Sequence, residues 1–350
     1  MILLHIREAT HGDNQQLIEL QRKCPMGSDL LLQLDGSPDF FNRSRGYKDW
    51  TILVAEENQQ IIGSAGVAVQ EKTIDDSLYQ GVYEYGFMVD PEQRRRGIAS
   101  KLQESIEKTA QEIGADFLYL NITDDNVASH SFFTRHGFKP VRQCSPLMFM
   151  AYKKHETDHY KIRPMKEGDI PVVVNLLNEY YRDLDLYTPY TNESFIEHFN
   201  RLPFYSMKDI YLFEHDTVKA VAGYWDYTKV MRFTIQGYNT RWKIMSAVAK
   251  VLGMITAMPK VPKIGEPMTN WYLTPFAYRD PGAGNQLLMH ILNKAYLDGV
   301  YMLGLPVDKE SRGYSELTKL SSNEGSFTFY VKQLIDLPEI KQIYIDPIDV

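Results

Sequence analysis

Cysteine is scarce in this sequence, which has only Cys24 and Cys144 in 350 residues. Two cysteines cannot build the disulfide framework of a small secreted domain, so a reducing compartment is expected. Apolar runs of membrane-spanning length are also missing. The segment Met1–Glu8 is too short for a signal peptide and indicates a first strand. We therefore expect a soluble, cytoplasmic protein without integral membrane association.

An excess of positive charge is absent as well. The net charge of −7 argues against nucleic acid as the main partner and favours cationic or neutral substrates. A hydrophobic content of 44% and a charged content of 24% are ordinary for globular proteins. The length of 350 residues is sufficient for two domains.

The most informative stretch runs from Val89 to Ala99. Before it, alternating aromatic and apolar residues predict a strand, and after it an apolar face at helical spacing predicts a helix. The segment is therefore strand, tight basic turn and helix. The strand residues are Tyr83, Tyr85, Phe87 and Val89, and the helix face is Ile98, Leu102, Ile106, Ala110 and Ile113.

This turn has the chemistry of a phosphate site. Unpaired amides at a helix start, together with the helix dipole, favour an anion there. The arginines from Arg94 to Arg96 add charge, and Gly97 allows a ligand to approach the backbone closely. Neither a Walker loop nor a Gly-x-Gly-x-x-Gly dinucleotide fingerprint is present. A pyrophosphate or phosphate ligand of another class is indicated.

Arg94-x-x-Gly97-x-Ala99, with its lead-in Val89-Asp90-Pro91, resembles the coenzyme A pyrophosphate loop of the GNAT N-acetyltransferases. A second block of the same family pattern follows, Asn126-x-x-Ser129-x-x-Phe132-Phe133-x-Arg135-x-Gly137-Phe138. A predicted strand, Phe117 to Asn121, separates the two blocks. The resemblance implies an α/β fold with a mixed sheet and the element order βαβββαβαβ.

In that fold, the region between the first two strands forms a wall of the acceptor pocket. The corresponding residues here, Gly27 to Gly46, are polar and predict irregular chain with a short helix around Pro38 to Phe41. Nearby aromatic residues could touch substrate or simply pack in the core. They are Phe40, Phe41, Tyr47 and Trp50.

The resemblance further implies acetyl transfer from acetyl-CoA to a primary amine by direct attack in a ternary complex, without a metal. The amide of Met88 or Val89 could polarise the thioester carbonyl. Glu84 is the carboxylate within this strand and is the candidate general base, with a structural carboxylate as the alternative. The residues implied in cofactor binding are Phe87, Met88, Val89, Arg94, Arg95, Arg96, Gly97, Ile98, Ala99, Ser100, Asn126 and Phe133.

Phe133 departs from the family pattern. The matching position commonly holds a tyrosine that protonates the departing thiolate, and phenylalanine has no proton to give. Ser129 and His130 belong to the same predicted helix, but their spacing alone assigns them no role. The identity of any general acid stays open.

The chain repeats itself. Ile6-Arg7 and Gly12-Asp13 recur with the same spacing as Ile162-Arg163 and Gly168-Asp169, and Arg94-x-x-Gly97-x-Ala99 recurs as Arg279-x-x-Gly282-x-Gly284. We expect two tandem GNAT domains. The first spans residues 1–152 and is the catalytic one, 153–159 is a linker, and the second spans 160–350 with an insertion near 228–266.

The second copy is expected to be degenerate. Asp280 and Pro281 replace two arginines, and Thr269 is placed in register with Glu84. Ser311 to Tyr314 could start a helix there. The insertion contains a largely apolar helix from Trp242 to Ile255, suited to a membrane surface or hydrophobic substrate, or to packing against a second domain or subunit. In the linker, His155 and His159 lie beside acids, but solvated charge explains them better than a metal.

Three functions compete. An N-acetyltransferase leads, a non-catalytic acyl-CoA-binding or sensing protein is the second, and a protein-interaction scaffold using the 228–266 insertion is the third. The acceptor, which could be a small amine or a peptide or protein amine, varies within this fold. Acyl-chain preference, CoA binding by the second copy and oligomeric state, including a homodimer, are not fixed by the sequence.

Overall fold

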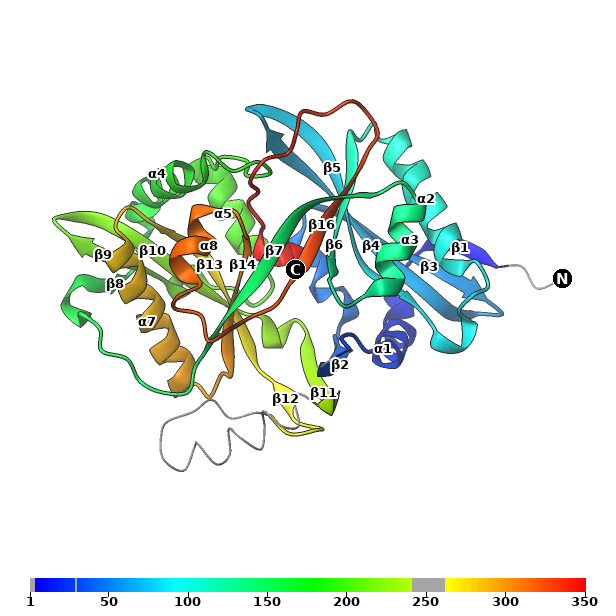
Figure 1. The fold of residues 1–350 in the computed structure, drawn as a ribbon, viewed down its shortest axis with the longest axis horizontal. Coiled ribbons are helices and arrows are strands. Elements are labelled where there is room, and N and C mark those ends of the chain that lie inside the picture. The colour runs from blue at the N-terminus through cyan, green and yellow to red at the C-terminus, as the bar shows by residue number, and fades with distance from the viewer. Residues whose placement is uncertain (1–3, 29, 241–261) are drawn as a thin grey trace.

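The computed structural model describes residues 4–28, 30–240 and 262–350, so the expected helix from Trp242 to Ile255 lies outside the described residues. Two α/β units lie side by side, joined by one large sheet (Figure 1). The first unit contains β1 (His5–Glu8), α1 (Asn14–Lys23), β2 (Leu30–Asp35), β3 (Asp49–Glu57), β4 (Gln60–Ile74), β5 (Ser77–Val89), α2 (Ile98–Glu112), β6 (Phe117–Thr123), α3 (Val127–Arg135) and β7 (Lys139–Met150).

The second unit repeats this order with additions. Its elements are β8 (Ile162–Pro164), α4 (Ile170–Tyr181), α5 (Asn192–Arg201), β9 (Ile210–His215), β10 (Thr217–Asp226), β11 (Arg232–Tyr238), β12 (Pro267–Met268), β13 (Asn270–Tyr278), α7 (Pro281–Leu297), β14 (Met302–Asp308), α8 (Arg312–Leu317), β15 (Asn323–Glu324) and β16 (Phe327–Gln333).

Most of the described strands form one mixed sheet, in the order β1-β3-β4-β5-β6-β16-β7-β14-β13-β10-β9-β8. Strand β16, from the second half of the chain, pairs antiparallel with β6 of the first unit and with β7. Strand β7, from the first half, pairs in turn with β14 of the second unit. The two units therefore exchange a strand, and the sheet continues from one to the other.

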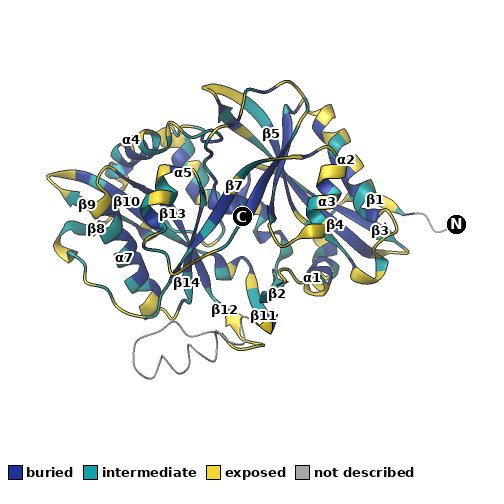
Figure 2. Ribbon diagram, in the orientation of Figure 1, coloured by how far each residue is buried: buried dark blue, intermediate teal, exposed yellow. Residues whose placement is uncertain are grey.

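Helices cover both faces of this sheet. In the first unit α2 packs on one face and α1 on the other, and in the second unit α7 and α4 are divided in the same way. One core cluster spans both units, because it includes Leu17 of α1, Val173 of α4 and Ile348 near the C-terminus. Figure 2 shows buried residues in the strands and helices of both units.

Most elements predicted in the first half are confirmed, including the strand, turn and helix around Val89 to Ala99. The region from Gly27 to Gly46 is different from the prediction. It contains strand β2, while the expected helix near Pro38 is two 3-10 turns, Phe40–Asn42 and Ser44–Gly46. The run of leucines at 30–32 lacks the alternation that indicates a strand.

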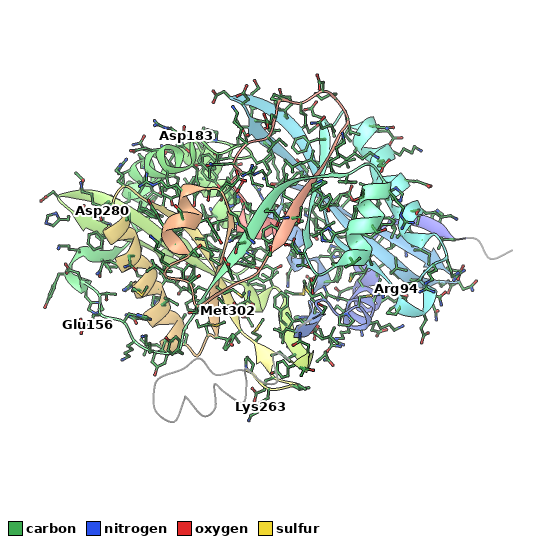
Figure 3. The ribbon with its side chains drawn as sticks, in the orientation of Figure 1. Arg94, Glu156, Asp183, Lys263, Asp280 and Met302 are labelled. Atoms are coloured by element: carbon green, nitrogen blue, oxygen red, sulfur yellow. The ribbon has the colours of Figure 1, made fainter. Side chains whose placement is uncertain are left out.

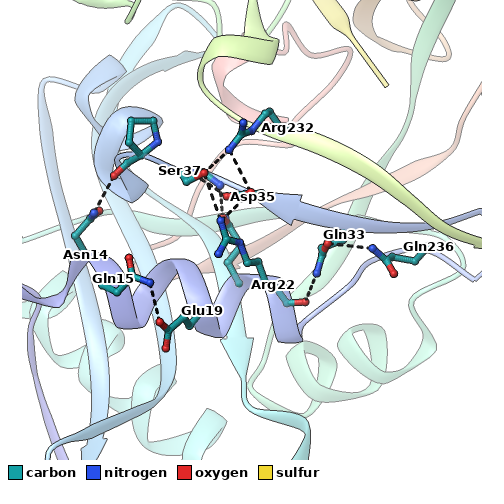
Figure 4. Close-up of polar contacts among 12 residues, drawn as sticks. Asn14, Gln15, Glu19, Arg22, Gln33, Asp35, Ser37, Arg232 and Gln236 are labelled. Carbon is teal, nitrogen blue, oxygen red and sulfur yellow. Dashed lines mark hydrogen bonds and ion pairs between the residues drawn. The ribbon is translucent and has the colours of Figure 1, made fainter. Parts of the chain in front are cut away.

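Strand β2 forms because of a partner far away in the sequence. It pairs antiparallel with β11, which belongs to the insertion in the second unit. Side chains reinforce the junction, since Arg232 lies 3.3 Å from Asp35 and Gln236 donates to Gln33 at 3.0 Å (Figure 4). The insertion therefore ties the second unit to the first through a small separate sheet.

Candidate functional site

The turn between β5 and α2 has the geometry of an anion site. Gly97 is the N-cap of α2 with φ of 76°, in the left-handed region that glycine adopts freely, and no side chain caps the helix. Arg95 is also left-handed, with φ of 64°. The first-turn amides of this long helix therefore point into the turn, and no carboxylate of the described part of the chain caps them. An anion is stabilised at such an uncapped helix start.

The three arginines of this turn differ in their contacts. Arg96 is held by Glu57 at 2.7 Å and also donates to Gln93. Arg94 donates to the carbonyl of Val89 at 3.4 Å, and Arg95 is exposed with no ion-pair partner among the described residues. Arg95 and Arg94 can turn toward a phosphate at little cost, whereas Arg96 must first release Glu57.

The strands beside this turn part before they reach it. Strand β5 runs parallel to β6 only from Gly81 to Tyr83, and beyond Tyr83 the two part. A β-bulge in the pairing of β4 with β5 and a φ of 58° at Gly86 accompany the parting. Phe87, Met88 and Val89 thus lie on the stretch of β5 that is not paired with β6. Their backbone groups there could bind an amide-rich chain.

Glu84 is buried, with 3% of its surface exposed, and its carboxylate lies beneath α2. Gln103 of α2 donates to Oε1 at 3.0 Å, while Oε2 has no partner among the described residues. Burial raises the pKa of Glu84 to about 8. Its neighbours Tyr83 and Tyr85 point to the opposite face and pack against Tyr47.

The second family block forms helix α3. Asn126 is its N-cap, accepting from the amide of Ser129 at 3.1 Å. Phe133 is buried between Phe87 and Phe138, with ring centroids 5.5 and 5.4 Å away, so it packs the floor beneath the end of β5. Ser100 on α2 lies 3.4 Å from His136 at the end of the same block.

His130 is fully engaged by structural contacts. One ring nitrogen lies 2.8 Å from the hydroxyl of Tyr330 and the other 3.2 Å from the carbonyl of Thr123. His130 is therefore not free to act as a general acid, and Phe133 has no proton to give.

The C-terminal residues lie on the tyrosine face of the first unit, which the sequence motifs did not indicate. Tyr47 donates to the carbonyl of Ile348 at 2.7 Å, and Tyr83 and Asn121 donate to the carbonyl of Asp349. The buried carboxylate of Asp349 lies 3.3 Å from the ammonium of Lys72. Burial raises the pKa of Asp349, while Lys72 opposes the rise.

The chain segment from Asp346 to Val350 thus crosses the first unit where β5 and β6 part. In the sequence, the sign of this contact is the pair of acids, Asp346 and Asp349, in the otherwise apolar stretch from Ile345 to Val350. A carboxylate buried among apolar residues needs a partner. The four aromatic residues named as possible substrate contacts divide between two groups. Tyr47 contacts this segment, whereas Phe41 packs with Phe40 and Trp50.

The corresponding turn of the second unit is closed to anions. Asp280 caps α7 by accepting from the amide of Ala283 at 2.8 Å, and Arg279 is held by Glu179 at 2.7 Å. Gly282 and Gly284 lie inside α7, so the recurring glycine spacing does not form a loop in the second unit. Arg94 and Asp280 lie far apart, in different units (Figure 3).

The register of β13 also corrects one assignment. Tyr83 pairs with Tyr119 in the first unit, and Tyr272 pairs with Gly304 in the second. Glu84 therefore corresponds to Leu273 rather than to Thr269, because the second turn is shorter. The second unit has no acid at the position of Glu84, whether Leu273 or Thr269 is aligned with it.

Within the described ranges, no helix is both long and apolar enough to span a bilayer. No three His, Cys, Asp or Glu side chains in that part of the chain are grouped to hold a metal ion.

Comparison with known proteins agrees with this geometry. Residues 15–138 match the model of the acetyltransferase (GNAT) family. "Probable N-acetyltransferase HLS1" of Arabidopsis thaliana is 28% identical over 155 residues, 38% of this chain and 38% of that protein. "Probable N-acetyltransferase HLS1-like" of the same plant is 27% identical over 180 residues, 43% and 44% of the two chains. The chain thus spans less than half the length of these curated relatives.

Solved structures share the two-unit architecture. Saccharomyces cerevisiae N-myristoyltransferase with bound myristoyl-CoA and inhibitors superposes with a TM-score of 0.66 at 12% identity, over 99% of this chain and 83% of that one. A glucosamine N-acetyltransferase region of a fungal β-N-acetylglucosaminidase superposes with a TM-score of 0.61 at 14% identity, over 95% of this chain and 38% of that one. The fold is that of two tandem GNAT-type units. The match to the GNAT family model falls within the first unit.

Proposed function

We propose that the first unit transfers an acetyl group from acetyl-CoA to an amine. The observation that carries this proposal is the contrast between the two helix starts. The start of α2 is uncapped, left-handed at Gly97 and lined by arginines, whereas the start of α7 is capped by Asp280. Backbone amides and guanidinium groups at an open helix N-terminus suit the pyrophosphate of CoA.

The remaining groups suit the other parts of the cosubstrate. The unpaired edge of β5 from Phe87 to Val89 can hydrogen-bond the amide-rich pantetheine arm. The amide of Met88 or Val89 would stabilise the oxyanion that develops on the thioester carbonyl. Asn126 fixes the start of α3, and Phe133 closes the apolar floor below the arm.

Proton transfer is assigned to Glu84 as the candidate base. Its pKa of about 8 is close to the working pH, as efficient proton abstraction requires. The carboxylate lies under α2, so an acceptor amine would reach it through the opening between β5 and β6 or through an intervening water. Glu84→Gln should reduce kcat with little change in acetyl-CoA affinity. Equal turnover by the variant and the wild type would remove Glu84 from this role.

Calorimetry with acetyl-CoA tests the cosubstrate site. Replacing Arg94, Arg95 and Arg96 together by alanine should weaken binding at least about tenfold, since charge-assisted contacts to phosphate are lost. Arg279→Ala, at the closed turn of the second unit, is the matched control and should bind as the wild type does. No heat of binding at about 1 mM acetyl-CoA would contradict the proposal.

A non-catalytic acyl-CoA sensor is the second candidate, favoured by the lack of a proton donor at Phe133. A panel of amines, amino acids and short peptides, assayed with acetyl-CoA and with a long-chain acyl-CoA, separates the two. Turnover of any amine supports the enzyme and identifies the acyl chain. Tight acyl-CoA binding with no turnover of any acceptor supports the sensor.

A further inference from the structure

Arg43 is a partly buried arginine with no acidic partner in the described chain. It lies between the 3-10 turns Phe40–Asn42 and Ser44–Gly46. Its guanidinium lies over the ring of Tyr85, 5.0 Å from the centroid, and donates through Nη2 to the carbonyl of Ile348 at 3.3 Å. The Nε atom is buried and has no hydrogen-bond partner among the described residues.

The missing acid is unusual for this protein. Three other partly buried arginines, Arg7, Arg142 and Arg163, each form ion pairs with two carboxylates at 2.5–2.8 Å. A guanidinium removed from water without an anion costs free energy, so buried charges are normally paired. The titratable side chains that act most strongly on the charge of Arg43 are tyrosines, namely Tyr47, Tyr83 and Tyr85 of the first unit and Tyr227 of the second. The charge of Arg43 is therefore available to an anionic ligand.

A second unused group lies near this arginine. Asn121 of β6 donates through Nδ2 to the carbonyl of Asp349 at 2.9 Å, while its buried Oδ1 has no partner in the part of the chain that the structure describes. The bond through Nδ2 fixes which end of the amide is oxygen, so the unused atom is an acceptor. Asn121 follows Tyr119, the last residue of β6 paired with β5, and so lies where the two strands part.

The two unused groups are close enough for one small ligand. Arg43 and Asn121 contact consecutive carbonyls, those of Ile348 and Asp349, at 3.3 and 2.9 Å. Successive Cα atoms are about 3.8 Å apart, so the guanidinium and the amide lie within roughly 10 Å of each other. A molecule the size of an amino acid, with a hydrogen bond of about 2.9 Å at each end, spans a similar distance.

These two groups define the chemistry of such a ligand. The planar guanidinium matches a carboxylate through charge-assisted hydrogen bonds, and the amide oxygen accepts from an amine N–H. A ligand that satisfies both carries a carboxylate and an amine. The net charge of −7 favours cationic or neutral substrates for the protein as a whole, but Arg43 makes this place locally favourable to an anion.

The same two groups lie beside the proposed reaction centre. Tyr85, on which the guanidinium of Arg43 rests, precedes Met88 by three residues, roughly 10 Å along a strand. The side chain of Met88 packs against the core cluster that contains Tyr85. Asn121 lies at the opening between β5 and β6, where the pantetheine arm is proposed to bind. An amine at Asn121 would therefore be near the thioester while its carboxylate reaches Arg43.

We propose that the acceptor is a small aminocarboxylate of the amino acid type, with its carboxylate on Arg43 and its amine on Oδ1 of Asn121. The inference rests on the proposed acetyl transfer and names its acceptor class. In that reaction the amine nitrogen forms a bond to the acetyl carbonyl carbon, the C–S bond of acetyl-CoA breaks, and sulfur leaves as the thiolate. The proton lost by the nitrogen goes to the base, Glu84. Arg43 is then the residue that determines acceptor specificity.

A panel of L-amino acids, each paired with its carboxamide, is the probe. The release of CoA thiol from acetyl-CoA gives kcat/KM for each acceptor. The best amino acid should exceed its amide at least about tenfold, because the amide leaves the guanidinium without an anion. Arg43→Gln should lower the value for the acid to that of the amide and leave the amide within about twofold of wild type. Arg43→Lys keeps the charge and should retain part of the preference.

Arg45→Gln is the matched control. Arg45 belongs to the turn that follows Arg43, is exposed, and is paired with Asp39 at 2.6 Å, so the variant makes the same change of charge away from the site. It should keep the wild-type preference for acids over amides. A purely structural role for Arg43 would instead lower the values for acids and amides by the same factor, and that result would overturn the inference.

Equilibrium binding separates this inference from acetyl transfer itself. Saturation-transfer NMR with the same panel, in the presence of free CoA, requires no turnover. If amino acids bind, their amides do not, and Arg43→Gln abolishes the binding, the aminocarboxylate site is supported even when no acceptor is acetylated, and acetyl transfer alone fails. Acetylation of amides as fast as of acids, or of amines without a carboxylate and no amino acid, would retain the transferase and overturn the site. Absence of both turnover and binding of every amino acid at about 1 mM would overturn it as well.

Discussion

Arg7 and Arg163 hold equivalent positions in the two units. Arg7 binds Asp13 at 2.8 Å and Glu56 at 2.6 Å, and Arg163 binds Asp169 at 2.7 Å and Glu214 at 2.5 Å. The sequence repeat that these residues define is therefore also a repeat of contacts. Each arginine ties the first strand of its unit to the turn before the first helix and to the neighbouring strand.

Asp13→Asn should destabilise the protein by about 1–2 kcal/mol at pH 7, because it removes a partly buried charge partner. Arg7 holds the pKa of Asp13 well below its usual value of 3.8. The stability that this pair contributes is present above pH 3.8 and is lost as the pH falls through the lower folded pKa. Urea unfolding from pH 7 to pH 3 should show the difference between variant and wild type shrinking at acid pH. Asp169→Asn should behave similarly, and a constant difference at all pH values would contradict the account.

Glu84 should make the stability of the protein depend on pH in the opposite direction. Its folded pKa of about 8 lies above the ordinary 4.5, so the native protein keeps a proton that the unfolded chain releases between these values. Stability should therefore fall as the pH rises from 4.5 to about 8, by up to a few kcal/mol. Glu107 raises this pKa and Lys332 lowers it, and the two are themselves paired at 2.6 Å.

Glu84→Gln removes the ionisable group and should flatten that part of the profile. Thermal unfolding in a pH series is the measurement, and the variant should gain on the wild type steadily toward pH 8. If the two profiles stay parallel, Glu84 is not protonated in the native protein.

At the scale of elements, the two helix starts show how one position in a fold diverges. The start of α2 depends on a left-handed Gly97, while the start of α7 depends on the Asp280 cap. The sequence predicted the strand, turn and helix of the first case, and the anion site at that turn stays a prediction. In the second copy the same glycine spacing recurs inside a helix, because a shorter turn moves those residues past the helix start.

Gly97→Ala should lower stability by about 1 kcal/mol, because alanine at φ of 76° is strained. It should also weaken acetyl-CoA binding, since relief of the strain rotates the first-turn amides away from the ligand. Gly168→Ala, in open space without positive φ, is the control and should leave both quantities unchanged. Calorimetry and thermal unfolding measure the two effects. Wild-type affinity in Gly97→Ala would indicate that the amide geometry of this turn does not matter for binding.

Local patterns predicted the local elements and missed those that depend on distant partners. Strand β5 alternates, and helix α2 has one apolar face, so both were evident from the sequence. Strand β2 has neither signal and exists because β11 pairs with it. Glu84 was named as a candidate because it is the acid in a patterned strand, whereas the contact of Asp349 with Lys72 joins residues 277 positions apart. No spacing rule connects such residues.

For the whole molecule, the sequence repeat and the folded units do not coincide. Strand β16 lies between β6 and β7, and β7 reaches β14. The shared core from Leu17 to Ile348 adds to this exchange. The domain limits at residues 152 and 160 remain a prediction about the repeat, and the exchanged strand suggests how to test them.

Residues 1–160 produced alone should fail to fold. Without β16 the facing edges of β6 and β7 stay unpaired and exposed, which favours aggregation. Loss of the C-terminal segment would also leave the buried ammonium of Lys72 without Asp349, a cost of several kcal/mol. Coexpression of 1–160 with 161–350 should restore a soluble complex in which both fragments copurify and unfold in one transition. A fragment 1–160 that is monomeric, melts cooperatively and binds acetyl-CoA would show instead that the first repeat folds as an independent domain, and that the exchanged strand only joins two units already formed.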